Sequence, residues 1–82
     1  MKKVLILQTY DGYEALYIND QLIDQGNELG EGNSRLYMLK ASEEYNFTSK
    51  DVKIVNLTEK DNDQVSSYGY FPSKLSGLSG KY

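Results

Sequence analysis

The residues best suited to bind a small molecule lie in a glycine-rich stretch, residues 26–34, directly before a segment with helical apolar spacing. Backbone N–H groups at the start of a helix attract anions, and glycine lets a phosphate approach the backbone closely. Arg35, the only arginine in the chain, falls in the first turn of that helix, where the helix dipole disfavours a cation unless a negative group is near. The pattern predicts an anion site formed by Gly30, Gly32, Asn33, Ser34 and Arg35.

The same loop has a second explanation that needs no ligand. Glu28 or Glu31 can form an ion pair with Arg35, and either carboxylate would also repel a phosphate. The stretch also lacks the lysine of a Walker motif. Two interpretations therefore stay open, a structural loop with an internal ion pair and a phosphate-binding loop.

Catalytic groups are scarce in this chain. It contains no histidine and no cysteine, which excludes catalytic triads, thiol nucleophiles and the usual zinc sites. The carboxylate pairs Asp11 with Glu14 and Glu43 with Glu44 are expected on a turn and on an exposed helix face, where they are solvated. Residues 61–63 resemble half of a calcium loop without its glycine and its closing glutamate. We expect no enzyme, no metal site and no cofactor.

Tyrosine is the other abundant chemical group, with eight residues and no tryptophan. Its ring has a large apolar face and a polar tip, and tyrosine is enriched on surfaces that bind bases or proteins. A purely structural role is the simpler explanation for most of them. In that explanation, Tyr10, Tyr13 and Tyr17 form cross-strand pairs, and Tyr37 and Tyr45 belong to the helix.

The aromatic cluster Tyr68, Tyr70 and Phe71 is a stronger candidate for a binding surface, because it lies in an irregular segment. Burying all three rings is difficult in a domain of this size. Together with Tyr10 and Tyr37, they are the rings on which a nucleotide base is expected to stack beside the glycine-rich loop.

These groups are expected to be positioned by a four-stranded sheet. Apolar and β-branched runs predict strands over residues 4–10, 13–18, 21–24 and 52–57. The turn Asp11-Gly12 is the stronger hairpin signal, and Asn19-Asp20 is the weaker one. A crossover that contains a helix connects parallel strands, which places the fourth strand beside the first, in the order 3-2-1-4. An arrangement with the fourth strand beside the third fits the same pattern.

One main helix is expected between the third and fourth strands. Asn33 or Ser34 can cap it, and the apolar stripe runs to about Tyr45. Residues 58–67 form either a short helix capped by Thr58 or a mobile loop, and Pro72 is expected to begin a last helical turn.

The predicted fold class is α+β, with a four-stranded, mainly antiparallel sheet, one main helix packed on one face and an irregular aromatic C-terminal segment. Residues 1–75 are expected to form a single domain. Residues 76–82 have the composition of a linker and are expected to form a flexible C-terminal tail.

Composition also limits the partners. The net charge of −3 argues against binding DNA or RNA, and no apolar run approaches the roughly 18 residues that a membrane span needs. The absence of cysteine suits a reducing compartment, so we expect a cytoplasmic protein. Because so short a chain has a thin core, we also expect a homodimer or a higher homo-oligomer.

Two runs of the sequence resemble a known class of proteins. DGYEALYINDQLIDQG, residues 11–26, and YGYFPSKLSGL, residues 68–78, are similar to small uncharacterised proteins encoded by phages, prophages and plasmids of Gram-positive bacteria. The resemblance implies a mobile-element accessory protein in the host bacterial cytoplasm. One implied role is to counteract a host defence system by sequestering a nucleotide immune signal. The other is to inhibit a host defence or regulatory protein by docking on it through an acidic, tyrosine-rich surface.

Overall fold

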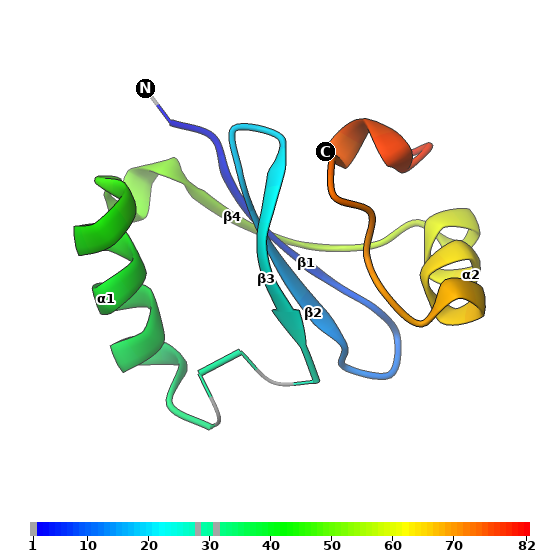
Figure 1. Cartoon of the computed structure of the whole chain (residues 1–82), viewed down its shortest axis with the longest axis horizontal. Coiled ribbons are helices and arrows are strands. Elements are labelled where there is room, and N and C mark those ends of the chain that lie inside the picture. Colours follow the sequence, from blue (N-terminus) through cyan, green and yellow to red (C-terminus); the bar gives the residue numbers. More distant parts are fainter. Residues whose placement is uncertain (1, 28, 31) are drawn as a thin grey trace.

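The computed structural model describes residues 2–27, 29–30 and 32–82. Its single sheet has the order β3-β2-β1-β4 (Figure 1), and its strands are Val4–Gln8 (β1), Glu14–Ile18 (β2), Gln21–Gly26 (β3) and Val52–Asn56 (β4). β2 is antiparallel to both β1 and β3, whereas β4 is parallel to β1. The predicted α+β class, strand order and mainly antiparallel character are confirmed.

Two helices lie on opposite sides of this sheet, at the two ends of the molecule (Figure 1). α1 (Ser34–Tyr45) is the predicted main helix, and the Asn33 side chain caps it by accepting from the Leu36 N–H at 3.2 Å. α2 (Glu59–Tyr68) is capped by Thr58, whose hydroxyl accepts from the Asp61 N–H at 3.3 Å. The second segment is therefore a helix, which settles the alternative of a mobile loop. No helix among the described residues is long and apolar enough to cross a membrane.

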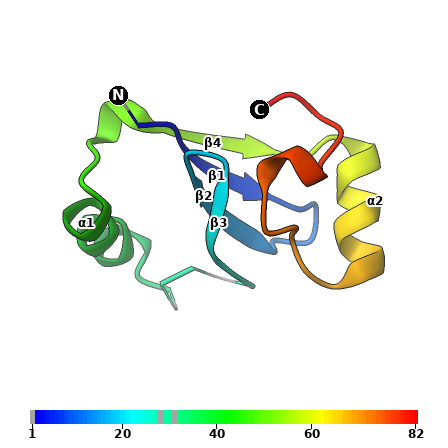
Figure 2. The same ribbon diagram turned by 45° about the horizontal axis from the view of Figure 1, so that its top comes forward.

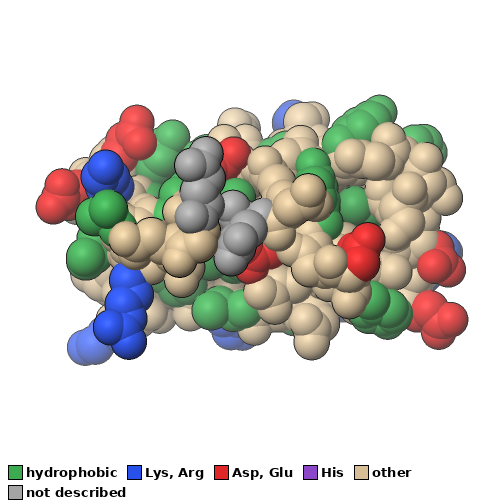
Figure 3. Space-filling view, turned by 90° about the horizontal axis from the view of Figure 1, so that it is seen from below, with side chains coloured by type: hydrophobic (Ala, Val, Ile, Leu, Met, Phe, Trp, Pro, Cys, Tyr) green, Lys and Arg blue, Asp and Glu red, His purple; other side chains and the backbone are tan. Residues whose placement is uncertain are grey.

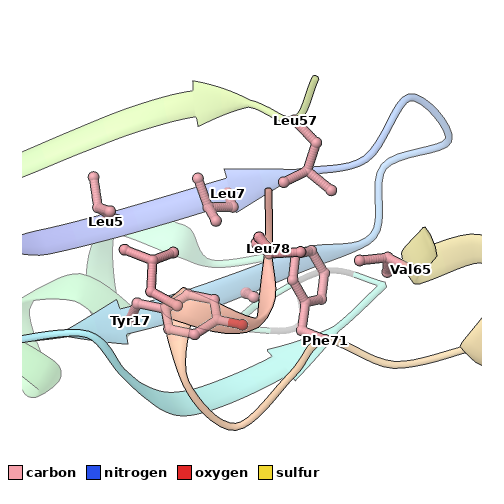
Figure 4. Close-up of a cluster of buried hydrophobic side chains, with 9 residues drawn as sticks. Leu5, Leu7, Tyr17, Leu57, Val65, Phe71 and Leu78 are labelled. Atoms are coloured by element: carbon pink, nitrogen blue, oxygen red, sulfur yellow. The ribbon is translucent and has the colours of Figure 1, made fainter. Parts of the chain in front are cut away.

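The central strand β1 is buried on both faces, because its residues alternate between two separate cores. The α1-side core contains Val4, Ile6, Leu16, Ile18, Leu29, Ala41 and Phe47. The α2-side core contains Leu5, Leu7, Ala15, Tyr17, Leu57, Val65, Phe71, Leu75 and Leu78 (Figure 4). A small chain thus divides its apolar residues between two thin layers.

The two hairpin turns differ from their predicted ranking. Asn19 and Asp20 both have positive φ, at 49° and 72°, as a type I′ turn requires. In the Asp11-Gly12 turn only Gly12 has positive φ, at 91°. Thr9 pairs with Tyr13 around a three-residue loop, in which a glycine in the left-handed conformation follows an ordinary turn. The loop is longer than expected, so Asp11 keeps a negative φ and no type I′ turn forms.

The residues after α2 are packed against the sheet. No helical turn begins at Pro72, contrary to the prediction, and the chain instead runs along the outer side of β3. There the Leu22 N–H donates to Ser73 O at 2.9 Å, and the Leu75 N–H donates to Asp20 O at 2.9 Å. A short 3-10 turn, Leu75–Gly77, follows.

The predicted domain boundary at residue 75 and the flexible tail are also corrected. Leu78 is buried in the α2-side core, and the N–H groups of Ser79 and Gly80 each donate to the Asp61 carboxylate at 2.8 Å. Linker-like composition failed as a guide because these small polar residues have a buried acceptor to bind.

The apolar stripe of α1 faces the core only in part. Ala41 is buried, but Leu36 and Leu39 are 46% and 63% exposed. On β4, Ile54 is 66% exposed, although it belongs to the apolar run that predicted this strand. On the α1 side of the sheet, the helix therefore leaves part of β4 uncovered.

Candidate functional site

The glycines of the predicted phosphate loop have structural roles in the backbone. Gly30 has φ +81°, and a Cβ there would lie 2.6 Å from the Tyr37 Cβ and 2.8 Å from Asn33 O. Its carbonyl accepts from the Asn33 N–H at 2.9 Å. Gly32 has φ +88° with open space around it. Both positions require glycine for chain direction, and Gly30 also lets the loop pack tightly on α1.

A pocket of about 420 Å³ lies beside this loop, between β3 and α1. Gly30, Asn33, Tyr37 and Lys40 line it together with Asp24. The Tyr37 hydroxyl donates to Asp24 Oδ2 at 2.8 Å. Burial raises the pKa of Tyr37, and the hydrogen bond to Asp24 raises it further. From the described residues, the pocket has one cation, one carboxylate and an aromatic ring.

Arg35 and Ser34 do not line this pocket. Arg35 lines a cleft of about 690 Å³ on the other side of α1, against β4, and Ser34 lines the continuation of that cleft toward Glu14. Gly32 is exposed and lines neither space. The predicted ion pair of Arg35 with Glu28 or Glu31 lies outside the described residues. Of the five residues predicted to hold a phosphate, two line the pocket on one side of α1, two line the cleft on the other side, and Gly32 lines neither.

Phe71 is not available for stacking on a ligand, because only 1% of it is exposed. Its ring stacks on Tyr13 with centroids 5.8 Å apart and meets Tyr17 edge-on at 6.3 Å. The Phe71 N–H donates to Gln25 Oε1 at 2.7 Å. The prediction of a surface role for Phe71 was wrong, because an apolar site between two tyrosine rings accommodates it.

Three exposed tyrosines lie at the α2 end, and we call them the tyrosine surface: Tyr10, Tyr68 and Tyr70, exposed by 65%, 64% and 57%. The rings of Tyr68 and Tyr70 lie 6.0 Å apart. The β1–β2 turn is held against α2, since the Tyr10 N–H donates to Asn62 Oδ1 at 2.8 Å. A small hollow of about 170 Å³ between them is lined by Asp11 and Gly69, among others.

The tyrosine surface is bordered by carboxylates. Asp11, Glu59 and Asp63 are exposed, and Figure 3 shows Asp and Glu side chains beside hydrophobic ones at the α2 end, on the right. Tyr37 lies with α1 on the opposite side of the sheet. Of the predicted stacking rings, the structure therefore leaves only Tyr37 beside the glycine-rich loop.

Among the carboxylates that the structure describes, only Asp61 is completely buried. It accepts from the Ser79 N–H and hydroxyl at 2.8 Å, from the Gly80 N–H at 2.8 Å and from the Tyr82 hydroxyl at 2.5 Å. Burial by itself raises the pKa of Asp61, but these hydrogen bonds outweigh burial and lower the pKa to about 2. Its role is structural, and no three metal-ligating side chains gather within the described part of the chain.

Sequence reasoning missed the cleft between α1 and β4. Its floor is formed by Ile6, Val52 and Ile54, and α1 supplies Met38 and Leu39 as its wall. The sequence assigned these apolar residues to two strands and to the stripe of the main helix, and it predicted no cleft between them. No local signal separates an apolar residue at a sheet edge from one at its centre, because both fit the same alternating pattern.

Two candidate surfaces therefore stand at opposite ends of the molecule, an aliphatic cleft beside β4 and the tyrosine surface beside α2. The mixed-charge pocket of about 420 Å³ beside the glycine-rich loop is a third candidate. Comparisons with protein-family models, with curated proteins and with solved structures found no match to this chain.

Proposed function

We propose that this chain is a non-enzymatic binding protein that inhibits a host protein by docking on it through the tyrosine surface. The observation that carries the proposal is the exposure of Tyr10, Tyr68 and Tyr70, between 57% and 65%, at one end of a small domain. Tyrosine is enriched at protein interfaces and among the residues that dominate binding energy.

Rigid support favours binding by these rings. Phe71, directly after Tyr70, packs between the rings of Tyr13 and Tyr17, and the Asn62 side chain accepts a hydrogen bond from the Tyr10 N–H. Rings presented on a fixed backbone lose little conformational entropy when they bind. The exposed side chains are therefore arranged in advance for a partner.

The charge around the rings suggests the kind of partner. At this end three exposed carboxylates, Asp11, Glu59 and Asp63, stand against one exposed lysine of α2, Lys60, in a chain of net charge −3. Such a surface complements a basic patch, which would speed association and discriminate against acidic proteins. The resemblance to mobile-element proteins supports a host defence or regulatory protein as the partner.

The test is capture from a host lysate with a matched pair of variants. The wild type is expected to recover one stoichiometric protein, and Tyr68→Ser combined with Tyr70→Ser is expected to lose it. Leu36→Ser, which removes an exposed apolar side chain on α1, is expected to retain it. Recovery of the same protein by the double tyrosine variant would contradict the proposal.

A nucleotide sponge is the second candidate, favoured by the pocket of about 420 Å³ beside the glycine-rich loop. In that pocket Lys40 is the cation and Tyr37 the ring, whereas Arg35 lies across α1. Saturating nucleotide at a hundred times its dissociation constant would stabilise the protein by about 2.7 kcal/mol. A shift in melting temperature that Lys40→Ala abolishes and Arg35→Ala preserves would favour this candidate. A panel of linear and cyclic nucleotides without any shift would remove it.

A further inference from the structure

β4 has an unpaired edge. The Leu57 N–H donates to Gln8 O at 3.0 Å, toward β1, and alternate residues of a strand direct their backbone groups to opposite sides. The N–H and C=O groups of Ile54 and Asn56 therefore point away from β1. Within the described residues no strand lies beyond β4, which Figure 2 shows as the outermost strand.

This bare edge coincides with the aliphatic cleft. The parallel register pairs Ile6 with Ile54, so Ile54 lies on the α1 side of the sheet. There Ile54 is 66% exposed and Leu39, on the facing wall of α1, is 63% exposed. A free row of hydrogen-bonding groups beside exposed aliphatic side chains is a template for adding a strand.

We propose that the occupant is a second copy of this chain, joined by antiparallel β4–β4 pairing about a twofold axis at Ile54. The dimer then has one continuous eight-stranded sheet, and the two α1 helices lie on the same face, one on each side of the axis. Each copy closes the open side of the other's cleft. The tyrosine surfaces remain free at the far ends, so this inference does not depend on the proposed function.

The strand is compatible with its own antiparallel copy. With Ile54 opposite Ile54 of the partner subunit, Lys53 faces an apolar valine and Val52 faces an asparagine. No like charges stand directly opposite one another, which would otherwise destabilise the pairing. β4 also contains no proline and its pairing with β1 has no bulge, so two common edge protections are absent. Its one charged residue, Lys53, is paired with Leu5 and lies on the α2 side of the sheet, away from the cleft.

The charges on α1 fit the same axis. Arg35 and Glu43 lie four residues before and four residues after Leu39, and residues four apart on a helix share a face. With the twofold axis beside Leu39, the two α1 helices of the dimer run antiparallel. Arg35 of one copy then lies toward Glu43 of the other copy. Leu39 and Ile54 line the same cleft, so one axis satisfies both the helices and the strands.

The first test is the molar mass by light scattering across a concentration series. The wild type is expected at twice its 9.3 kDa mass, and Ile54→Lys at 9.3 kDa with an unchanged circular dichroism spectrum. The dissociation constant should rise at least about a hundredfold, since two lysines replace a central apolar contact. Tyr68→Lys is the matched control, because Tyr68 is 64% exposed, and it should remain dimeric. A monomeric wild type, or a dimer that survives Ile54→Lys, would overturn the proposal.

A cysteine test checks the register, because the chain has no cysteine of its own. Directly opposed residues of this kind have Cα atoms about 5.5 Å apart, within the range that a disulfide spans. Ile54→Cys alone should cross-link on oxidation. Val52→Cys combined with Asn56→Cys should also cross-link, whereas each of these two changes alone should not. Cross-linking by the single Val52→Cys variant to the same extent would refute this register.

Discussion

The two edges of the sheet are treated in opposite ways. At the β3 edge, Leu22 pairs with Ser73, an isolated bridge joins Gln21 to Lys74, and a bulge interrupts the β2–β3 register. At the β4 edge, the ladder with β1 is regular and no described segment covers its outer side. Proteins commonly guard an edge with a bulge or a covering segment, and here only β3 has these protections.

The difference shows how a small chain controls association. The segment that covers β3 also supplies Phe71, Leu75 and Leu78 to the α2-side core. The same segment therefore protects the edge strand and completes this core. No described segment packs along the outer side of β4 in this way, and Ile54, on the α1 side of the sheet, stays 66% exposed. Any pairing with another strand is therefore directed to β4.

The largest expected effect comes from removing the anchor of the covering segment. Phe71→Ala should lower the free energy of unfolding by about 3 to 5 kcal/mol, because it leaves a cavity between Tyr13 and Tyr17. Urea unfolding measures the loss. Tyr70→Ala, one residue earlier and 57% exposed, should change stability by less than about 0.5 kcal/mol. Equal effects of the two substitutions would mean that the segment does not pack on the core.

The Asp61 carboxylate accepts hydrogen bonds from Ser79, Gly80 and Tyr82, and these bonds should make the free energy of unfolding depend on pH. The pKa of Asp61 is lowered from 3.8 to about 2, so its contribution to stability is present above pH 3.8 and is lost as the pH falls toward 2. We expect Asp61→Asn to cost about 2 kcal/mol at neutral pH and much less at pH 2. Unfolding of both proteins at the two pH values measures this. If Asp61→Asn lowers the free energy of unfolding by the same amount at both pH values, the stabilising role of the Asp61 carboxylate is contradicted.

A smaller effect is expected at the β3 edge itself. Gln25→Ala removes the acceptor of the Phe71 N–H and should cost about 1 kcal/mol, measured as a shift in the urea midpoint. Gln21→Ala, on the same strand and exposed, is the control, since its side chain has no hydrogen bond among the described residues. If Gln21→Ala is the more damaging change, the assignment of this contact is wrong.

Amide hydrogen exchange compares the two edge strands directly, through the exchange rates of single backbone N–H groups. In the monomeric Ile54→Lys protein, the Leu22 amide should exchange slowly because it donates to Ser73 O. The Asn56 amide, on the bare edge, should exchange quickly in that variant and more slowly in the wild type at high concentration. Equal exchange of Leu22 and Asn56 in the monomer would remove the contrast between the edges.

Much of the fold follows from local pattern. The four strands and the main helix were predicted from residue type and spacing, because these features depend on neighbours in the chain. The Asn33 cap was predicted as an alternative to Ser34, and the helix capped by Thr58 as an alternative to a mobile loop. The place of β4 beside β1 followed from the crossover rule, with a place beside β3 as the alternative. The candidate site was predicted less well. Gly30, Asn33 and Tyr37 do line one pocket, but Arg35 does not, since successive helical residues point to different sides.

The sequence by itself determined the strands, the helix caps, the lack of histidine and cysteine chemistry and the abundance of tyrosine. Only the tertiary structure decided which apolar residues are buried. Phe71 and Leu78 find sites in the α2-side core, while Ile54 and Leu39 are left exposed. Burial depends on which distant segments meet, and that information is absent from any local window of the chain.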